Sequence, residues 1–130
     1  MPIKTLVVDS SPSVRRLLRY RLTACGCDRF SETASAAQAL AKLRAEKYDL
    51  VTLDLLTPPS EGIGGEQAFQ KIRADFPDTA VIITSPVTHD AVRADYLKRG
   101  ALGYLVKPLT APTFETARSL IRRRFGTGSK

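Results

Sequence analysis

The side chains best suited to chemistry in this sequence stand where apolar, strand-like runs end. Two are carboxylates: Asp9 follows the run 3–8, and Asp54 closes the run 49–54. Ser85 follows a third run, and Lys107 follows a fourth. Ligands of open α/β sheets bind in the crevice beyond the carboxyl ends of the strands, so these four side chains predict one common site. Four reactive side chains at corresponding strand ends are hard to attribute to chance.

The strand-like runs alternate with segments of helical spacing, and this alternation predicts the fold. Short runs bounded by turn residues predict strands at 3–8, 29–33, 49–54, 80–84 and 103–106. Periodic apolar positions and capping residues predict helices at 12–25, 36–43, 65–76, 90–99 and 110–125. In the fourth helix, Val92, Tyr96 and Leu97 are expected to face the core. Five strand–helix repeats require an α/β fold, a mostly parallel sheet with helices on both faces.

The bulk composition indicates one soluble domain. The chain has 130 residues, of which 43% are hydrophobic and 25% charged, as is typical of globular proteins. We expect a single domain over residues 1–125 and a flexible tail over 126–130. No apolar run approaches the roughly 20 residues that span a bilayer, and no signal peptide is apparent, so a cytoplasmic protein is expected. Cys25 and Cys27 are expected to be reduced thiols.

The strand-end motifs resemble the receiver domain of response regulators, the CheY-like modules of two-component signalling. The resemblance covers nearly the whole chain and is carried by Val7-Val8-Asp9, Leu53-Asp54 with Pro58 four residues on, Ile82-Ile83-Thr84-Ser85, Gly100-Ala101, and Tyr104-Leu105-Val106-Lys107-Pro108. It implies a flavodoxin-like (βα)5 doubly wound sandwich with a five-stranded parallel sheet in the order 2-1-3-4-5. It also implies a phosphoprotein that is not an enzyme, apart from catalysing the phosphorylation of its own aspartate.

By this resemblance, Asp54 is the phosphoryl acceptor, and the donor is a histidine kinase or a histidine phosphotransfer protein. Lys107 pairs with the phosphoryl group, Ser85 is the switch hydroxyl and Tyr104 the switch aromatic. The phosphoryl oxygens would attract Ser85 and vacate space into which Tyr104 turns, which remodels a face that contacts a downstream protein partner. The resemblance also permits a cis peptide bond between Lys107 and Pro108.

The resemblance further implies a Mg²⁺ ion held by Asp9, Asp54 and the main-chain carbonyl of Leu56. The sequence departs from the family here, because Ser10 stands where a second acid is usual. Serine offers only a weak, neutral ligand, so two carboxylates instead of three would face the cation, and we expect weak Mg²⁺ binding. The alternative function is a pseudo-receiver, an interaction module that works without phosphorylation.

Two more departures concern the loops around the site. The stretch between Asp54 and the helix that begins at Gly65 has three extra residues, which predicts a lid over 58–64 that screens the site or contacts a partner. Leu56 and Val87 occupy the positions, two past the acceptor and two past the switch hydroxyl, that influence hydrolysis of the acyl phosphate in the family. Because neither side chain can orient water, slow self-dephosphorylation is expected.

The formal net charge of +7 is concentrated at the two ends of the chain. Residues 1–27 and 113–130 each carry five Lys or Arg and one acid. The family fold puts the first and last helices on the same side of the sheet, which predicts a basic surface made by Arg15, Arg16, Arg19, Arg21, Arg118, Arg122, Arg123 and Arg124. We expect this surface to dock an acidic partner such as a histidine kinase or phosphotransfer domain.

Two other functions fit the sequence less well. A flavin- or nucleotide-binding protein could use the loop 10–13 for phosphate, but the chain lacks a glycine-rich phosphate loop and this function leaves Lys107-Pro108 unexplained. Nucleic-acid binding through the basic ends would call for a repeated interleaving of aromatic and basic residues, which the two ends do not show.

Overall fold

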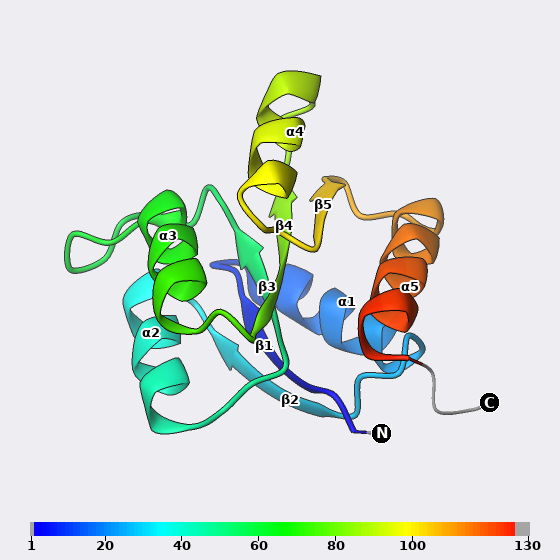
Figure 1. The fold of residues 1–130 in the computed structure, drawn as a ribbon, viewed down its shortest axis with the longest axis horizontal. Helices are drawn as coiled ribbons and strands as arrows, with labels where there is room; N and C mark the ends of the chain where they lie inside the picture. Colours follow the sequence, from blue (N-terminus) through cyan, green and yellow to red (C-terminus); the bar gives the residue numbers. More distant parts are fainter. Residues whose placement is uncertain (1, 127–130) are drawn as a thin grey trace.

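The computed structural model describes residues 2–126. The structure does not describe Met1 and residues 127–130. Residues 127–130 make up most of the expected tail, so this prediction lies outside the described residues. Strands and helices alternate five times along the chain (Figure 1), in the order β1 (Lys4–Val8), α1 (Pro12–Thr23), β2 (Arg29–Thr33), α2 (Ala36–Ala45), β3 (Leu50–Asp54), α3 (Gly65–Asp75), β4 (Ala80–Ser85), α4 (Asp90–Lys98), β5 (Gly103–Val106) and α5 (Ala111–Phe125). Within the described chain, none of these helices combines the length and the apolar character that crossing a membrane requires.

The five strands form a parallel sheet in the order β2-β1-β3-β4-β5. Helices α1 and α5 cover one face, and α2, α3 and α4 lie on the other (Figure 1). The predicted fold class, a flavodoxin-like (βα)5 sandwich with this strand order, is confirmed. Because all strands run parallel, their carboxyl ends meet along one edge of the sheet, and the predicted site residues stand at that edge.

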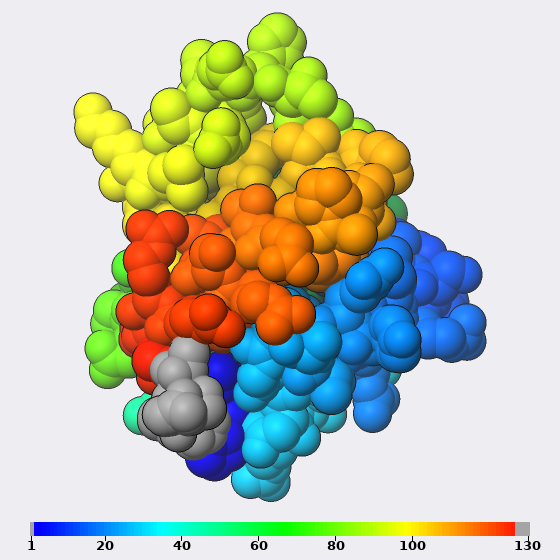
Figure 2. All heavy atoms as spheres, turned by 90° about the vertical axis from the view of Figure 1, so that its right-hand side faces the viewer, coloured from blue at the N-terminus to red at the C-terminus, as the bar shows by residue number. Residues whose placement is uncertain are grey.

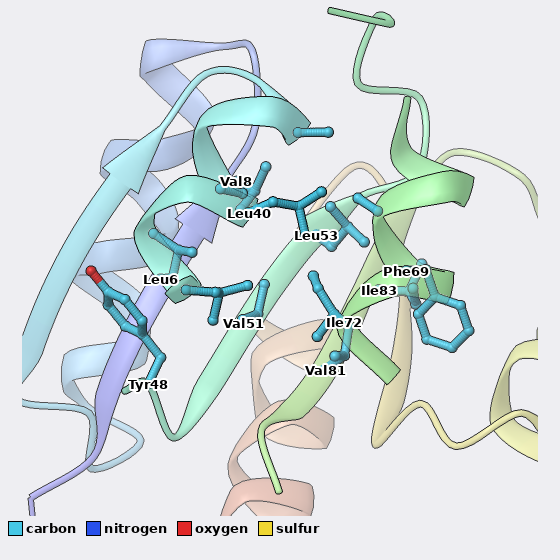
Figure 3. Packing of buried hydrophobic residues seen from close by; sticks show 14 of the residues in the cluster. Leu6, Val8, Leu40, Tyr48, Val51, Leu53, Phe69, Ile72, Val81 and Ile83 are labelled. Atoms are coloured by element: carbon cyan, nitrogen blue, oxygen red, sulfur yellow. The ribbon is translucent and has the colours of Figure 1, made fainter. Parts of the chain in front are cut away.

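Burial on both faces of the sheet explains the nearly continuous apolar runs of the central strands. Every residue of β3 and β4 is buried, as expected for parallel strands covered on both sides. Alternate side chains enter opposite layers: Val51 and Leu53 pack toward α2 and α3, whereas Leu50 and Ile82 pack toward α1 and α5. Figure 3 shows the first of these layers at close range. Packing on both sides therefore fixes the strand ends that carry the site.

The first two helices begin at the caps that the sequence predicts. The Ser11 hydroxyl accepts a hydrogen bond from the Val14 amide at 3.3 Å, and Pro12 occupies the first helical position of α1. The Ser35 hydroxyl caps α2 in the same way, through the Gln38 amide at 3.2 Å. The cap of α1 also fixes the turn between β1 and α1, which belongs to the predicted site.

Helix α4 is less buried than the sequence predicts. None of its nine residues is buried. Val92 and Tyr96 pack partly against the core, but Leu97 is 38% exposed, so the prediction that Leu97 faces the core is wrong. Val92 and Tyr96 are four residues apart and share one helix face, whereas the next residue is turned away by about 100°. Figure 1 shows α4 projecting beyond the strands.

Candidate functional site

The predicted site residues gather at the carboxyl edge of the sheet. Asp9 follows β1, and Asp54 ends β3, the strand paired with β1. Ser85 ends β4, opposite Val106 of β5, and Lys107 follows β5. The peptide bond between Lys107 and the next residue, a proline, is cis. Parallel pairing of neighbouring strands is what brings residues this far apart in the sequence to one edge.

Lys107 links the two carboxylates. Its ammonium nitrogen lies 2.8 Å from Oδ2 of Asp9 and 3.3 Å from Oδ2 of Asp54. Asp9 is 1% exposed and Asp54 is 6% exposed, so water screens these charges little. The centre of the site is therefore one largely buried cation shared by two buried anions.

The second oxygen of each carboxylate is held by the turn that follows it. Oδ1 of Asp9 accepts a hydrogen bond from the Ser11 amide at 2.9 Å, and Oδ1 of Asp54 accepts one from the Leu56 amide at 3.0 Å. When the amide two residues further along donates to a carboxylate in this way, the rotamer of the carboxylate side chain is restricted. Each carboxylate thus directs one oxygen to its own turn and the other to Lys107.

These contacts raise the pKa of Lys107 above its ordinary value. Burial, the strongest single influence, acts to lower this pKa. The hydrogen bond to Asp9 and the charges of Asp9 and Asp54 together outweigh burial. Lys107 is therefore a fixed positive charge at neutral pH and not a proton carrier.

Ser85 and Tyr104 hold the same residue of the loop after β4. The Ser85 hydroxyl accepts a hydrogen bond from the Val87 amide at 3.1 Å. The Tyr104 hydroxyl donates one to the Val87 carbonyl at 3.0 Å. The sequence places Val87 two residues past Ser85 but shows no sign of either contact. The two predicted switch residues are therefore connected through their hydrogen bonds to Val87.

Tyr104 lies inward in the structure. It is 7% exposed and belongs to the core layer on the α2–α3 side of the sheet. Its ring centre lies 6.2 Å from that of Tyr96 in α4. The expectation from the sequence is that Tyr104 turns inward once Ser85 has moved toward a phosphoryl group. In this structure Tyr104 occupies such an inward position.

The oxygen atoms near Lys107 suit a hard cation such as Mg²⁺, but they bring few charges. Asp9 and Asp54 supply two carboxylates, and the turn that contains Leu56 begins directly after Asp54. Ser10 is exposed and adds only a hydroxyl. Among residues 2–126, no three His, Cys, Asp or Glu side chains cluster closely enough to hold a metal ion. The donor set therefore fits Mg²⁺ with less charge than a site with three acids would offer.

The longer loop before α3 contains a very small hairpin. Ser60 and Ile63 form an antiparallel bridge with hydrogen bonds of 2.9 and 3.0 Å. Glu61 and Gly62 between them have positive φ values of 53° and 77°, as in a type I′ turn. In Figure 1 this loop extends outward beside α3, away from β4 and β5. Of the two expected roles for the lid 58–64, this direction favours contact with a partner.

The ion pairs that stabilise the turn after β1 cannot be predicted from the sequence. Arg15 donates to the Asp9 carbonyl at 2.6 Å and to Glu32 of β2 at 3.1 Å, and Arg19 pairs with Glu32 at 3.0 Å. Burial acts to raise the pKa of Glu32, but the hydrogen bonds from Arg19 and Arg15 lower it below its ordinary value. Arg15 and Glu32 are 17 residues apart, so no local pattern reveals the contact. Two arginines of the predicted docking surface are therefore paired within the chain.

Sequence comparison decides the family. The family model for the response regulator receiver domain matches residues 5–118. This chain belongs to that family. Receiver domains are signalling modules of two-component systems and not classical enzymes. In general they are phosphorylated on an aspartate with the help of Mg²⁺, and they interact with histidine kinases or phosphotransfer proteins and with downstream effectors.

Similar proteins include regulators of transcription and of chemotaxis. The receiver domain is 36% identical over 121 residues to "Probable transcriptional regulator ycf27" of Porphyridium aerugineum, an alignment that covers 92% of this chain and 48% of that protein. It is 29% identical over 105 residues to the chemotaxis protein CheY of Thermotoga maritima, covering 81% and 85% of the two chains. The receiver domain thus spans about half of the first relative and most of the second.

A solved structure supports the same fold. The chemotaxis response regulator CheY4 of Vibrio cholerae matches this receiver domain with a TM-score of 0.79 at 24% sequence identity. The match covers 92% of this chain and 99% of that one. At this identity the likeness concerns the fold, and the site has to be judged from its own residues.

Proposed function

We propose that this receiver domain accepts a phosphoryl group on Asp54 and passes the change to a downstream protein. The donor is a histidine kinase or a histidine phosphotransfer protein, and the receiver's own residues catalyse the transfer. The observation that supports this proposal most is the position of the Lys107 ammonium, 3.3 Å from Asp54 and 2.8 Å from Asp9.

The arrangement suits an attack by Asp54 on phosphorus. A carboxylate oxygen of Asp54 forms the new P–O bond while the bond from phosphorus to the donor atom breaks, and the donor atom keeps the electron pair. Negative charge spreads over the phosphoryl oxygens in such a loose transition state, so positioning and a fixed cation are the main requirements. Lys107 supplies the cation, and the Leu56 amide holds the other oxygen of Asp54 in place.

Mg²⁺, when bound, would neutralise further charge on the phosphoryl oxygens. The residues that would hold it are Asp9, Asp54 and the Leu56 main-chain carbonyl, with Ser10 as a weak additional ligand. Because Asp9 and Asp54 also share the Lys107 ammonium, we infer a low affinity for the metal.

Ser85 and Tyr104 would carry the signal away from the acceptor. The Ser85 hydroxyl accepts a bond from Val87 and still has its own proton to donate to a phosphoryl oxygen. Movement of Ser85 would shift Val87, and with it Tyr104, because both hydroxyls bind that residue. The state of Asp54 is in this way coupled to the face formed by α4 and β5.

A pseudo-receiver is the second candidate, and Ser10 is the observation that favours it. The site has one acid fewer than the family usually provides. Lys107 already neutralises part of the charge of the two acids that remain. Such a site would fail to bind Mg²⁺, and the chain would then act through protein contacts alone.

Intact-mass spectrometry after incubation with acetyl phosphate separates the two candidates. Our proposal predicts the addition of one phosphoryl group, which requires Mg²⁺ and disappears in Asp54→Asn. The matched control is Asp75→Asn, which removes an exposed acid at the end of α3 and should leave the increment unchanged. Absence of any increment in the wild type, even at high Mg²⁺ concentration, would favour the pseudo-receiver and contradict the proposal.

A further inference from the structure

A cluster of charged and aromatic side chains joins α3 to α4. Glu66 of α3 accepts hydrogen bonds from the Tyr96 hydroxyl and from the Arg99 guanidinium, the latter at 2.7 Å. Gln70 also donates to Glu66, at 2.7 Å. One carboxylate therefore receives donors from three side chains that lie on α3, on α4 and directly after α4.

Aromatic contacts continue from this cluster to Tyr104. The Arg99 guanidinium lies 5.1 Å from the ring centre of Phe69 and 4.8 Å from that of Tyr96. Phe69 and Tyr96 meet edge to face with their centres 5.1 Å apart. Tyr96 in turn stands 6.2 Å from Tyr104. These contacts form an unbroken series from Glu66 to the predicted switch aromatic.

Helix α4 has few other contacts that could fix its position. None of its nine residues is buried, and Val92 and Tyr96 are the apolar side chains that pack partly against the core. A helix with so little buried apolar surface opens at a low free-energy cost. The position of α4 beside Tyr104 therefore depends on the polar contacts of Tyr96 and Arg99.

The ionisation states of the cluster suit a lasting contact. Burial and then the hydrogen bond to Glu66 raise the pKa of Tyr96 to about 12, so its hydroxyl keeps the proton that it donates. Burial acts to raise the pKa of Glu66, but the hydrogen bonds from Arg99, Tyr96 and Gln70 lower it below its ordinary value. At neutral pH a carboxylate thus meets protonated donors only.

We propose that Glu66, Tyr96 and Arg99 form a clamp that holds α4 against Tyr104 and so keeps Tyr104 inward. The clamp uses no residue assigned to phosphoryl transfer. Its meaning for signalling rests on the proposed function. If the clamp holds Tyr104 inward, the shape of the α4–β5 face depends on the contacts of Glu66 as well as on the state of Asp54.

Ring NMR signals of the tyrosines test the clamp in protein that has received no phosphodonor. The chain has four tyrosines. Tyr20 is 74% exposed and Tyr48 is 1% exposed, so they provide an exposed and a buried reference in the same spectrum. In the wild type we expect Tyr104 to resemble Tyr48.

Weakening the clamp should release Tyr104. In Glu66→Gln and in Arg99→Gln, we expect the Tyr104 signal to move toward that of Tyr20. Amide hydrogen exchange in α4 should become about 10-fold faster, because a charged hydrogen bond that holds the helix is lost. The matched control is Glu115→Gln, which removes an exposed carboxylate from a 3.9 Å pair with an arginine on α5 and should change neither signal nor exchange.

Two outcomes would overturn the clamp. One is an unchanged Tyr104 signal with normal exchange in α4 in variants whose Tyr48 signal shows that the fold is intact. If the variants lose the Tyr48 signal, a salt titration of the wild type decides instead. The Glu66 and Arg99 side chains are 38% and 32% exposed, so salt should screen the pair and shift Tyr104. A Tyr104 signal that does not shift at high salt is the second outcome that would overturn the clamp. Neither measurement involves Asp54, so failure here is distinct from a missing mass increment.

Discussion

At the residue scale, Lys107 is the side chain on which the two buried carboxylates depend. Lys107→Met leaves Asp9 and Asp54 close together without a cation. We expect the free energy of unfolding to fall by about 2 kcal/mol, less than for a fully buried pair because the Lys107 side chain is 21% exposed. Urea-induced unfolding measures this loss. The double variant with Asp9→Asn should recover part of it, and a double variant no more stable than Lys107→Met would contradict the ion-pair interpretation.

The raised pKa of Lys107 adds a pH dependence to the same contact. A group whose pKa is raised by folding stabilises the folded state fully below its ordinary pKa and loses this effect as the pH rises through the folded value. The stability difference between wild type and Lys107→Met should therefore persist from neutral pH to the ordinary lysine pKa and shrink above it. Urea unfolding of both proteins over an alkaline pH series tests this, and a difference that vanishes near neutral pH would argue against it.

Leu56 gives a kinetic prediction that depends on the proposed phosphorylation. This side chain is 58% exposed beside the acceptor and cannot orient an attacking water. The wild type should lose its phosphoryl group slowly, and Leu56→Asn should lose it about 10-fold faster. The decay of the phosphorylated mass after removal of acetyl phosphate measures the rate. Leu97→Asn, at another exposed leucine, is the control. Equal rates for Leu56→Asn and wild type would refute the prediction.

Some residues of the site could be predicted from the sequence and others could not, for a physical reason. Asp9, Asp54 and Lys107 are visible because each marks the end of an apolar run, and parallel strands bring such ends together. Glu32 and the two hydrogen bonds of Val87 could not be predicted, because these contacts arise from tertiary packing and leave no local pattern. The clamp residues on α3 and α4 are hidden in the same way, since each alone is an ordinary polar or aromatic position on a helix.

At the element scale, the start of α3 depends on the absence of a side chain at Gly65. A Cβ built there would lie 2.3 Å from the Leu55 carbonyl oxygen, which is backbone and cannot yield easily. Gly65→Ala should therefore lower the free energy of unfolding by about 2 kcal/mol. Gly64→Ala is the control, because its nearest neighbour is the flexible Gln67 side chain at 3.2 Å. Equal midpoints of urea unfolding for the two variants would count against this.

The elements themselves were largely predictable from periodicity. Strand and helix order follows from the alternation of short apolar runs with helical spacing, and α3 begins at Gly65 as predicted. The exposure of Leu97 was not predictable, because periodicity cannot tell which side of a short helix faces the core when the helix buries little. The direction of the loop 58–64 likewise depends on a local turn, not on a sequence period.

At the scale of the whole molecule, α1 and α5 lie on the same side of the sheet, and Figure 2 shows α5 in orange and red beside α1 in blue. Among residues 2–126, four arginines of this surface are exposed and have no acidic side chain within 4.0 Å: Arg16, Arg122, Arg123 and Arg124. Arg124 donates instead to the Asp78 carbonyl at 3.0 Å. Arg16, Arg122 and Arg123 remain available for the proposed docking of an acidic partner, whereas Arg15 and Arg19 are engaged by Glu32.

The docking hypothesis predicts a salt-dependent association. Stopped-flow mixing with an acidic phosphotransfer partner should give an association rate that falls several-fold as salt is raised, because steering by exposed charges is screened. Arg16→Gln combined with Arg122→Gln should slow association at low salt. Lys98→Gln on α4, which removes one positive charge from another face, should not. An association rate that does not change with ionic strength would contradict the docking hypothesis.

The location of the phosphoryl group tests the central claim most directly. Borohydride reduces an aspartyl phosphate to homoserine, and fragmentation of the peptides then identifies the modified position. After treatment with acetyl phosphate and Mg²⁺, we predict homoserine in place of Asp54 and at no other acid, with none in the untreated protein. Homoserine in place of Asp9 or of an exposed acid, or none anywhere, would contradict the claim that Lys107 and Asp9 prepare Asp54 as the acceptor.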